Sequence, residues 1–267
     1  MPSTLSLTML TITPVPAFSD NYIWFIRQAG QRQVAIVDPG DAAPVLAALQ
    51  RGKLEPAALL ITHHHGDHVG GIRRLLEHYP ELPVYGPAGE RIPQITQRLS
   101  DGDRVRLEAL EAEFEVFDVP GHTAGHIAYY TDRALFCGDT LFTCGCGRVF
   151  DGSVEQLHAS LQRLKRLPPE TRIYCAHEYT LENIGFAKWV EPDNAALLQR
   201  EREAIRTREQ DRPTVPAELA LELATNPFLR TDDPGVIAMA ERHAGRAMHD
   251  ELDTFITLRH WKDVEYD

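Results

Sequence analysis

The chain has 267 residues, of which 43% are apolar and 25% are charged, a balance typical of folded globular proteins. It carries 39 acidic and 27 basic side chains, so its net charge is −12. An acidic chain lacks the basic face that a phosphate backbone needs, so we expect no nucleic-acid partner. The length permits one large domain or two smaller ones.

The sequence predicts neither export nor membrane insertion. The first basic residue is Arg27, which leaves the N-terminus without the charged region of a signal peptide. No run approaches the roughly 20 apolar residues that span a bilayer. The four cysteines match no disulfide scaffold or zinc knuckle: Cys137, Cys144, Cys146 and Cys175. We therefore expect free thiols, a cytoplasmic location and no membrane partner.

The first 180 residues alternate predicted strands and helices. Clusters of β-branched and aromatic residues between turn residues predict strands at 9–15, 22–28, 33–40, 57–62, 83–86, 104–110, 113–119, 127–131, 134–139 and 172–177. The spacing of apolar residues predicts helices at 43–52, 69–79 and 153–167, the first capped by Asp41 and the last opened by Ser153.

The composition changes near Thr180. From there strand-like runs disappear, and helices are predicted at 194–210, 216–225, 234–245 and 249–261. The sequence therefore predicts an α/β domain at 1–179, followed by a helical domain at 180–267.

Potential metal ligands lie directly after four of the predicted strands. His63, His122, Asp139 and His177 each follow a short apolar run. Open α/β sheets gather their ligand sites at the carboxyl ends of the strands. We therefore expect these four side chains to form one cluster, although each of them alone would have a structural explanation.

The stretch "THHHGDH" is the densest part of this pattern. In an extended segment His63 and His65 point to one side and His64 to the other, while Asp67 and His68 follow a turn at glycine. The run is internal, which argues against an expression tag, and a solvated loop is the remaining structural alternative. Imidazole and carboxylate groups suit zinc, iron or manganese, so the stretch could supply two ligands to each of two metals.

Four motifs carry a family resemblance. In this order, "THHHGDH", "PGHTAGH", "FCGDT" and "AHEYT" resemble the metallo-β-lactamase superfamily. The pieces "DNYIW", "VDPG", "GCGRVFDG", "HEYTLENIGFA" and "TNPFLR" are similar to one branch of it, the hydroxyacylglutathione hydrolases or glyoxalases II. The resemblance runs from about Asn21 to the end of the chain. It implies a four-layer αββα sandwich with a dinuclear metal site at one edge, followed by the helical domain.

The resemblance also assigns the ligands of two divalent ions. It implies that His63, His65 and His122 bind one metal, and that Asp67, His68 and His177 bind the other. Asp139 would bridge the two, and the resemblance leaves zinc, iron and manganese open as the metal. Asp67 and Asp139 would in addition orient the attacking hydroxide.

The reaction implied by the family is hydrolysis of S-(2-hydroxyacyl)glutathione, typically S-D-lactoylglutathione, the second step of methylglyoxal detoxification. Two metals can share a hydroxide, because metal binding lowers the pKa of water from 15.7 towards roughly 7. The bridging hydroxide would attack the thioester and release glutathione and D-lactate. The expected partner is therefore a small glutathione thioester, and we expect a monomer.

Substrate contacts are expected away from the metals. The resemblance implies that Arg259 and Lys262 bind the glycine carboxylate of glutathione, with Arg148 and Tyr179 as further contacts; a solvated basic helix end is the structural alternative for Arg259 and Lys262. Phe150 stands where relatives often carry a tyrosine, so one hydroxyl contact would be missing.

Three other functions fit parts of the pattern. A glutathione persulfide dioxygenase with a single iron belongs to the same superfamily, as do lactonases, but the long C-terminal region disfavours both. A purely structural metal site is the non-enzymatic alternative.

Overall fold

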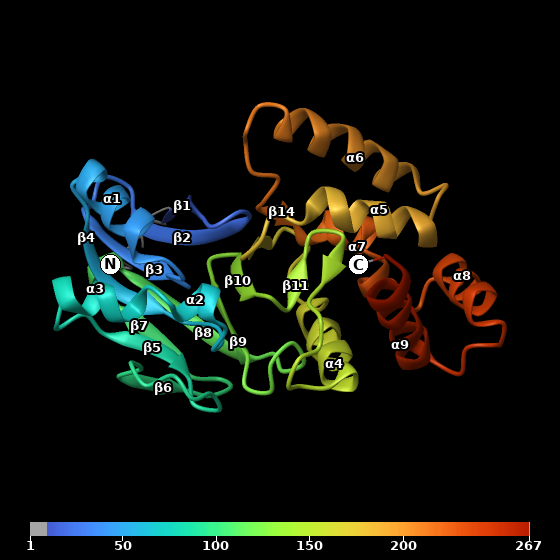
Figure 1. Ribbon diagram of the computed structural model, residues 1–267, viewed down its shortest axis with the longest axis horizontal. Coiled ribbons are helices and arrows are strands. Elements are labelled where there is room, and N and C mark those ends of the chain that lie inside the picture. Colours follow the sequence, from blue (N-terminus) through green and yellow to red (C-terminus); the bar gives the residue numbers. More distant parts are fainter. Residues whose placement is uncertain (1–9, 267) are drawn as a thin grey trace, which may run out of the picture. The chain divides into compact units, whose positions relative to one another are not determined.

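The computed structural model describes residues 10–266. They form two compact units, one ending at Phe117 and the other beginning at Asp118 (Figure 1). The predicted division at 179/180 is a different one and stays a prediction. Each unit has its own sheet and helices.

Six strands form the sheet of the first unit, in the order β1-β2-β3-β4-β5-β6. Their bounds are β1 Leu10–Ala17, β2 Asn21–Gln28, β3 Gln33–Val37, β4 Glu55–Leu60, β5 Val84–Pro87 and β6 Gln97–Leu99. The first three pair antiparallel, and β3 to β6 pair parallel. Parallel strands end at a common edge, and β4 delivers the histidine-rich segment there.

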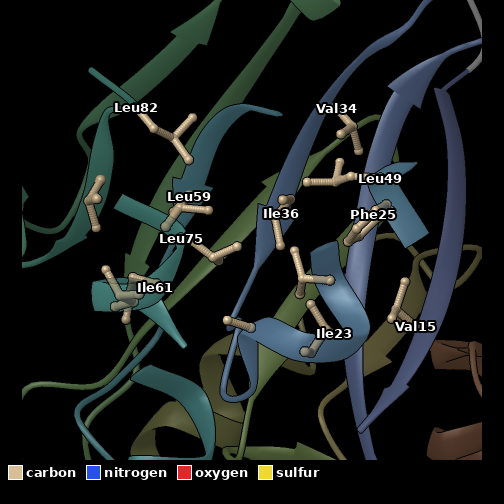
Figure 2. Close-up of a cluster of buried hydrophobic side chains, with 14 of the residues drawn as sticks. Val15, Ile23, Phe25, Val34, Ile36, Leu49, Leu59, Ile61, Leu75 and Leu82 are labelled. Atoms are coloured by element: carbon tan, nitrogen blue, oxygen red, sulfur yellow. The ribbon is translucent and has the colours of Figure 1, made fainter. Parts of the chain in front are cut away.

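The core of the first unit lies on one face of this sheet, against two helices. Side chains two residues apart on a strand share a face. Figure 2 shows such strand side chains in one cluster with Leu49 of α1 (Ala42–Gly52) and Leu75 of α3 (Ile72–His78). The cluster includes Ile23, Phe25, Val34, Ile36, Leu49, Leu59 and Leu75. Asp41 caps α1 as predicted, since its Oδ1 accepts a hydrogen bond from the Ala43 amide at 2.8 Å.

A hairpin completes the first unit. Its strands are β7 (Arg104–Leu107) and β8 (Ala112–Asp118), which pair antiparallel, and the 3₁₀ turn η1 (Glu108–Leu110) joins them.

In the second unit, four strands lie in the order β14-β13-β10-β9. They are β9 Ile127–Thr131, β10 Ala134–Gly138, β13 Arg172–Cys175 and the two-residue β14 Ala217–Glu218, and β10 pairs parallel with β13. A separate small hairpin consists of β11 Leu141–Phe142 and β12 Gly145–Cys146. We call Phe142–Cys146 the β11–β12 turn.

Helices make up the rest of the second unit. They are α4 Val154–Leu164, α5 Thr180–Val190, α6 Ala195–Arg208, α7 Leu219–Thr225, α8 Pro234–Ala244 and α9 Glu251–Trp261, with the short turns η2 Pro227–Leu229 and η3 Lys262–Tyr266. Helix α9 packs against α4 and α8, and α5 packs against α6 (Figure 1). Ser153 opens α4 with a reciprocal capping box to Gln156, which confirms the predicted start.

The structure corrects several predicted elements. Helix α5 and strand β6 were not predicted, and residues 216–225 begin with strand β14, so the expectation of no strand after Thr180 was wrong. The predicted helix 69–79 is interrupted, because α2 (Gly66–Val69) ends before α3 begins. The predicted strand 104–110 ends at Leu107, where η1 follows. Met9, the first residue of the first predicted strand, lies outside the described residues.

Two sequence expectations concern membrane-spanning segments and the cysteines. Within residues 10–266, no helix is both long and apolar enough to cross a membrane. The four cysteines are free, as predicted, and all four are buried.

Candidate metal centre

The first unit contributes four close side chains from the loop after β4 and from α2. His63 and His65 offer nitrogen atoms within 4.8 Å of each other, and their rings are 4.7 Å apart. Asp67 Oδ2 lies 3.4 Å from His68 Nε2. The rings of His63 and His68 are 4.1 Å apart, so the two pairs are neighbours. The geometry makes this segment a half-site rich in nitrogen and oxygen donors.

His64 lies outside that cluster, as the alternation of an extended segment predicts. Its Nδ1 contacts Oε2 of the buried Glu90. The contact with Glu90 accounts for the middle histidine of the run without any metal.

Asp38, directly after β3, orients the histidines of this half-site through hydrogen bonds. Its Oδ2 contacts His68 Nδ1 at 3.0 Å and accepts the hydroxyl of Thr62 at 2.7 Å. The same hydroxyl lies 3.0 Å from His63 Nδ1. When both Nδ1 atoms carry the proton, both Nε2 lone pairs face the cluster, which is the tautomer that a metal ligand needs.

The backbone around the half-site is packed without room for side chains. A Cβ at Gly40 would lie 1.6 Å from the carbonyl oxygen of Asp67, and one at Gly71 would lie 2.4 Å from that of Pro39. Glycine is therefore required for the loop after β3 to reach the ligand loop. Asn21 adds a side-chain contact, because its Nδ2 donates to Asp67 Oδ2 at 2.9 Å.

The second unit brings three further predicted ligands together. Asp139 follows β10 and His177 follows β13, and these parallel strands end at the same edge. Asp139 Oδ2 lies 3.5 Å from His122 Nε2 and 3.4 Å from His177 Nε2. One carboxylate oxygen thus faces two imidazole nitrogens, an arrangement suited to cations placed beside it.

Backbone and histidine contacts fix this second half-site. His122 Nδ1 lies 2.7 Å from the carbonyl oxygen of Arg148. This oxygen accepts a hydrogen bond from the protonated Nδ1, so that Nε2 faces Asp139. His126 is buried, and its Nε2 accepts a hydrogen bond from the backbone amide of Asp139 at 3.2 Å. It positions the carboxylate.

The donor chemistry of both half-sites fits divalent metals. Three histidines have Nδ1 next to an oxygen, and carboxylates accompany them in each unit. Neutral imidazole and carboxylate ligands suit zinc, iron and manganese alike. The histidine and aspartate side chains of the two half-sites are therefore able to bind metal.

The four predicted substrate contacts lie in the second unit. Tyr179 stacks on His177, with ring centroids 4.7 Å apart. Lys262 is buried and its Nζ lies 5.7 Å from the ring centroid of Tyr266. Arg148 Nε lies 3.5 Å from Asp263 Oδ1.

Arg259, the fourth of them, is almost fully buried rather than solvated. It donates to the backbone oxygen of Cys146 at 3.1 Å and to both carboxylate oxygens of Asp263. The alternative of a solvated basic helix end is therefore wrong for Arg259 and for the buried Lys262.

Side chains from the helices hold the β11–β12 turn that precedes Arg148. Asn226 Nδ2 donates to the carbonyl oxygens of Phe142 and Gly145, and Asn183 Nδ2 donates to that of Thr143. The buried carboxylate of Glu222 accepts the amide of Cys144 at 2.7 Å. These contacts were not predicted, because they join residues about 40 to 84 positions apart in the chain.

Glu222 is itself part of a buried ion pair. Burial raises its pKa, and Arg200, whose Nη2 lies 3.1 Å away, opposes that rise. A buried carboxylate needs such a partner to stay ionised.

Comparison with known proteins identifies the family. Residues 18–177 match the model of the metallo-beta-lactamase superfamily, and residues 178–264 match that of the hydroxyacylglutathione hydrolase C-terminus. The hydroxyacylglutathione hydrolase of Nitrosomonas europaea is 52% identical over 255 residues, which cover 96% of each chain. That of Xanthomonas axonopodis pv. citri is 52% identical over 95% of this chain and 98% of the relative.

A solved structure extends the likeness. TTHA1623 in a di-iron-bound form is 28% identical, with a TM-score of 0.57, and the match covers 82% of this chain and 100% of that one. The fold class is thus confirmed as a metallo-β-lactamase domain followed by a helical C-terminal region. The chain belongs to the hydroxyacylglutathione hydrolase family of the metallo-β-lactamase superfamily.

Proposed function

We propose that the chain hydrolyses the thioester of S-(2-hydroxyacyl)glutathione, typically S-D-lactoylglutathione, to glutathione and D-lactate. One observation carries the proposal: relatives named for this activity are 52% identical over nearly the full length, helical region included. The reaction would be the second step of methylglyoxal detoxification.

The proposed cofactor is a pair of divalent ions, zinc in the first place, with iron or manganese as alternatives. His63, His65 and His122 would hold one ion and Asp67, His68 and His177 the other, with Asp139 between them. The tautomers favoured by Asp38, Thr62 and the Arg148 carbonyl support this assignment, as does the di-iron form of TTHA1623. When bound, such ions make water acidic enough to react near neutral pH and polarise the carbonyl.

The side chains around the metals would orient the reactants. Asp67, held by Asn21, and Asp139, held by His126, would each accept a hydrogen bond from the attacking water. The leaving thiol of glutathione resembles cysteine, with a pKa of about 8.5. It therefore departs with little help from a general acid, which fits a site built from metal ligands.

The glutathione part would lie against the second unit. We propose that Arg259, Lys262, Arg148 and Tyr179 contact it, and that the functional domains are 1–179 and 180–267, in line with the two family matches. We further propose a cytoplasmic monomer, because free thiols suit a reducing compartment and one chain carries all the proposed residues.

A thioesterase assay with metal analysis on the same sample tests the proposal. The purified chain should hydrolyse S-D-lactoylglutathione and contain close to two metals, and Asp139→Ala should lose metal and most turnover. Asp232→Ala, at an exposed ion pair with Lys165, is the matched control and should behave as the parent. Oxygen consumption with glutathione persulfide, in place of thioester hydrolysis, would refute the proposal.

A further inference from the structure

Asp263 occupies the place at which a carboxylate of the substrate is expected. Both of its oxygens accept hydrogen bonds from the Arg259 guanidinium, from Nε at 3.2 Å and from Nη2 at 2.9 Å. Arg148 Nε approaches Oδ1 of the same carboxylate at 3.5 Å. Two cations assigned to the substrate therefore converge on a side chain of the protein itself.

This contact has a clear electrostatic cause. The Arg259 side chain is 3% exposed, and a buried cation without a counter-ion is strongly unfavourable. Its third donor, Nη1, is directed at the backbone oxygen of Cys146. The fork-shaped guanidinium edge that suits a carboxylate is therefore filled by Asp263, four residues further along the chain.

The location of Asp263 allows its side chain to rotate away from Arg259 into solvent. It lies in the π-helical turn η3, after the last residue of α9, and its side chain is 35% exposed. Rotation of a half-exposed aspartate towards water costs far less than exposure of a buried one. The cation, in contrast, is fixed through Cys146 to the β11–β12 turn.

We propose that Asp263 is an internal stand-in for the glycine carboxylate of glutathione, which the substrate must displace from Arg259. This inference rests on the proposed function. The exchange replaces one carboxylate by another, so the buried cation stays neutralised throughout. It makes Asp263 a specificity-determining residue, because a ligand without a terminal carboxylate cannot take its place.

The test is Asp263→Asn, which removes the charge but keeps the shape. Without the competing carboxylate, the KM for S-D-lactoylglutathione and the Kd of glutathione should both fall about tenfold, with kcat unchanged. The gain should vanish for the thioester whose glycine carboxylate is converted to an amide. Asp263→Glu, which restores a carboxylate, should return both constants towards those of the parent.

Glu265→Gln is the matched control. It removes one negative charge from the same turn, but Glu265 pairs with His243 at 3.7 Å and not with Arg259. A similar fall of KM in this variant would mean a general effect of charge and would overturn the proposal. Equal or higher KM and Kd in a folded Asp263→Asn variant would also overturn it, since Asp263 would then only align Arg259.

Two readouts separate this inference from the proposed function and from misfolding. Glutathione binding, measured by calorimetry, tests Asp263 even if the chain shows no thioesterase activity. In the unaltered chain, the ¹³Cγ resonance of Asp263 should shift on addition of glutathione and stay in place with glutathione glycinamide. An unmoved resonance with bound glutathione would refute the exchange.

Discussion

At the scale of single residues, His64 tests whether every histidine of the "THHHGDH" stretch is needed for metal binding. It lies between two predicted ligands, but its ring contacts Glu90, whose side chain is 2% exposed. His64→Ala should keep full metal content and lose about 1–3 kcal/mol of unfolding free energy, because the buried carboxylate of Glu90 loses a hydrogen bond. Urea unfolding and metal analysis measure the two effects.

His65→Ala is the comparison for this variant. His65 lies on the opposite side of the extended segment, beside His63, so its replacement should lower metal content. Loss of metal in His64→Ala, or its retention in His65→Ala, would show that the alternation of side chains does not separate ligand from bystander.

Residue patterns predicted the candidate ligands but not the groups that orient them. His63, Asp139 and His177 could be proposed because each follows a strand, and a common sheet edge collects such positions. Asp38, Asn21 and His126 lie within motifs of the family resemblance, but no local pattern predicts the roles of these three side chains, because tertiary packing determines their partners. The burial of Arg259 was missed for the same reason.

At the scale of elements, the helices of the second unit restrain the β11–β12 turn. Asn226→Ala removes the donor to two buried carbonyls and the cap of η2, where its Oδ1 accepts the Phe228 amide. We expect a loss of about 2–4 kcal/mol in unfolding free energy, measured by urea unfolding.

The matched control is Ser153→Ala, at the start of α4. The Ser153 side chain also caps a helix, through the amide of Gln156, but it lies outside the turn. It should lose about 1 kcal/mol. Equal losses in both variants would mean that Asn226 acts only as a cap.

Helix α4 carries a pH-sensitive contact with α9. The His158 ring lies 5.2 Å from that of Phe255, and burial lowers the pKa of His158 despite the opposing charges of Glu251 and Asp250. The unfolded chain therefore binds the proton more tightly, and the stabilisation is present above about pH 6.5 and lost as the pH falls. His158→Gln should flatten the decline of Tm with falling pH.

Thermal unfolding between about pH 7.5 and 5.5 measures this difference, since the range includes the ordinary histidine pKa. His260→Gln, at an exposed position of α9, should decline like the parent. Parallel curves for the parent and for His158→Gln would assign the pH dependence to other groups.

Element prediction succeeded where one local pattern dominated. Runs of β-branched and aromatic residues gave β2 and β3, and Ser153 with acidic and amide residues in the first turn gave the start of α4. Helix α5 went unnoticed because its apolar residues are distributed around the helix, without a single stripe. Strand β14 has two residues and exists through its pairing with β13, which no local pattern reveals.

At the scale of the whole molecule, the proposed metals should contribute to the stability of the folded chain. A ligand that binds only the folded chain stabilises it by mass action, by about 4 kcal/mol at a thousandfold excess over its Kd. Removal of metal by a chelator should therefore lower Tm by roughly 10 °C for a chain of this length. Calorimetry of loaded and stripped protein measures the change.

The control for metal removal is Asp139→Ala, whose Tm should hardly respond to the chelator. An unchanged Tm in the parent, with its metal content demonstrably reduced, would mean that the ions contribute chemistry but no stability.

The tight backbone approach at Gly40 and Gly71 has a practical consequence for mutational surveys. In a saturation screen scored by activity, both positions should tolerate substitution as poorly as His63 or Asp139, because any Cβ meets a main-chain oxygen within 2.4 Å. A screen that records only which substitutions abolish activity would therefore class Gly40 and Gly71 with the metal ligands. Metal content distinguishes variants of the glycines from variants of the proposed metal ligands when equal concentrations of folded protein are compared.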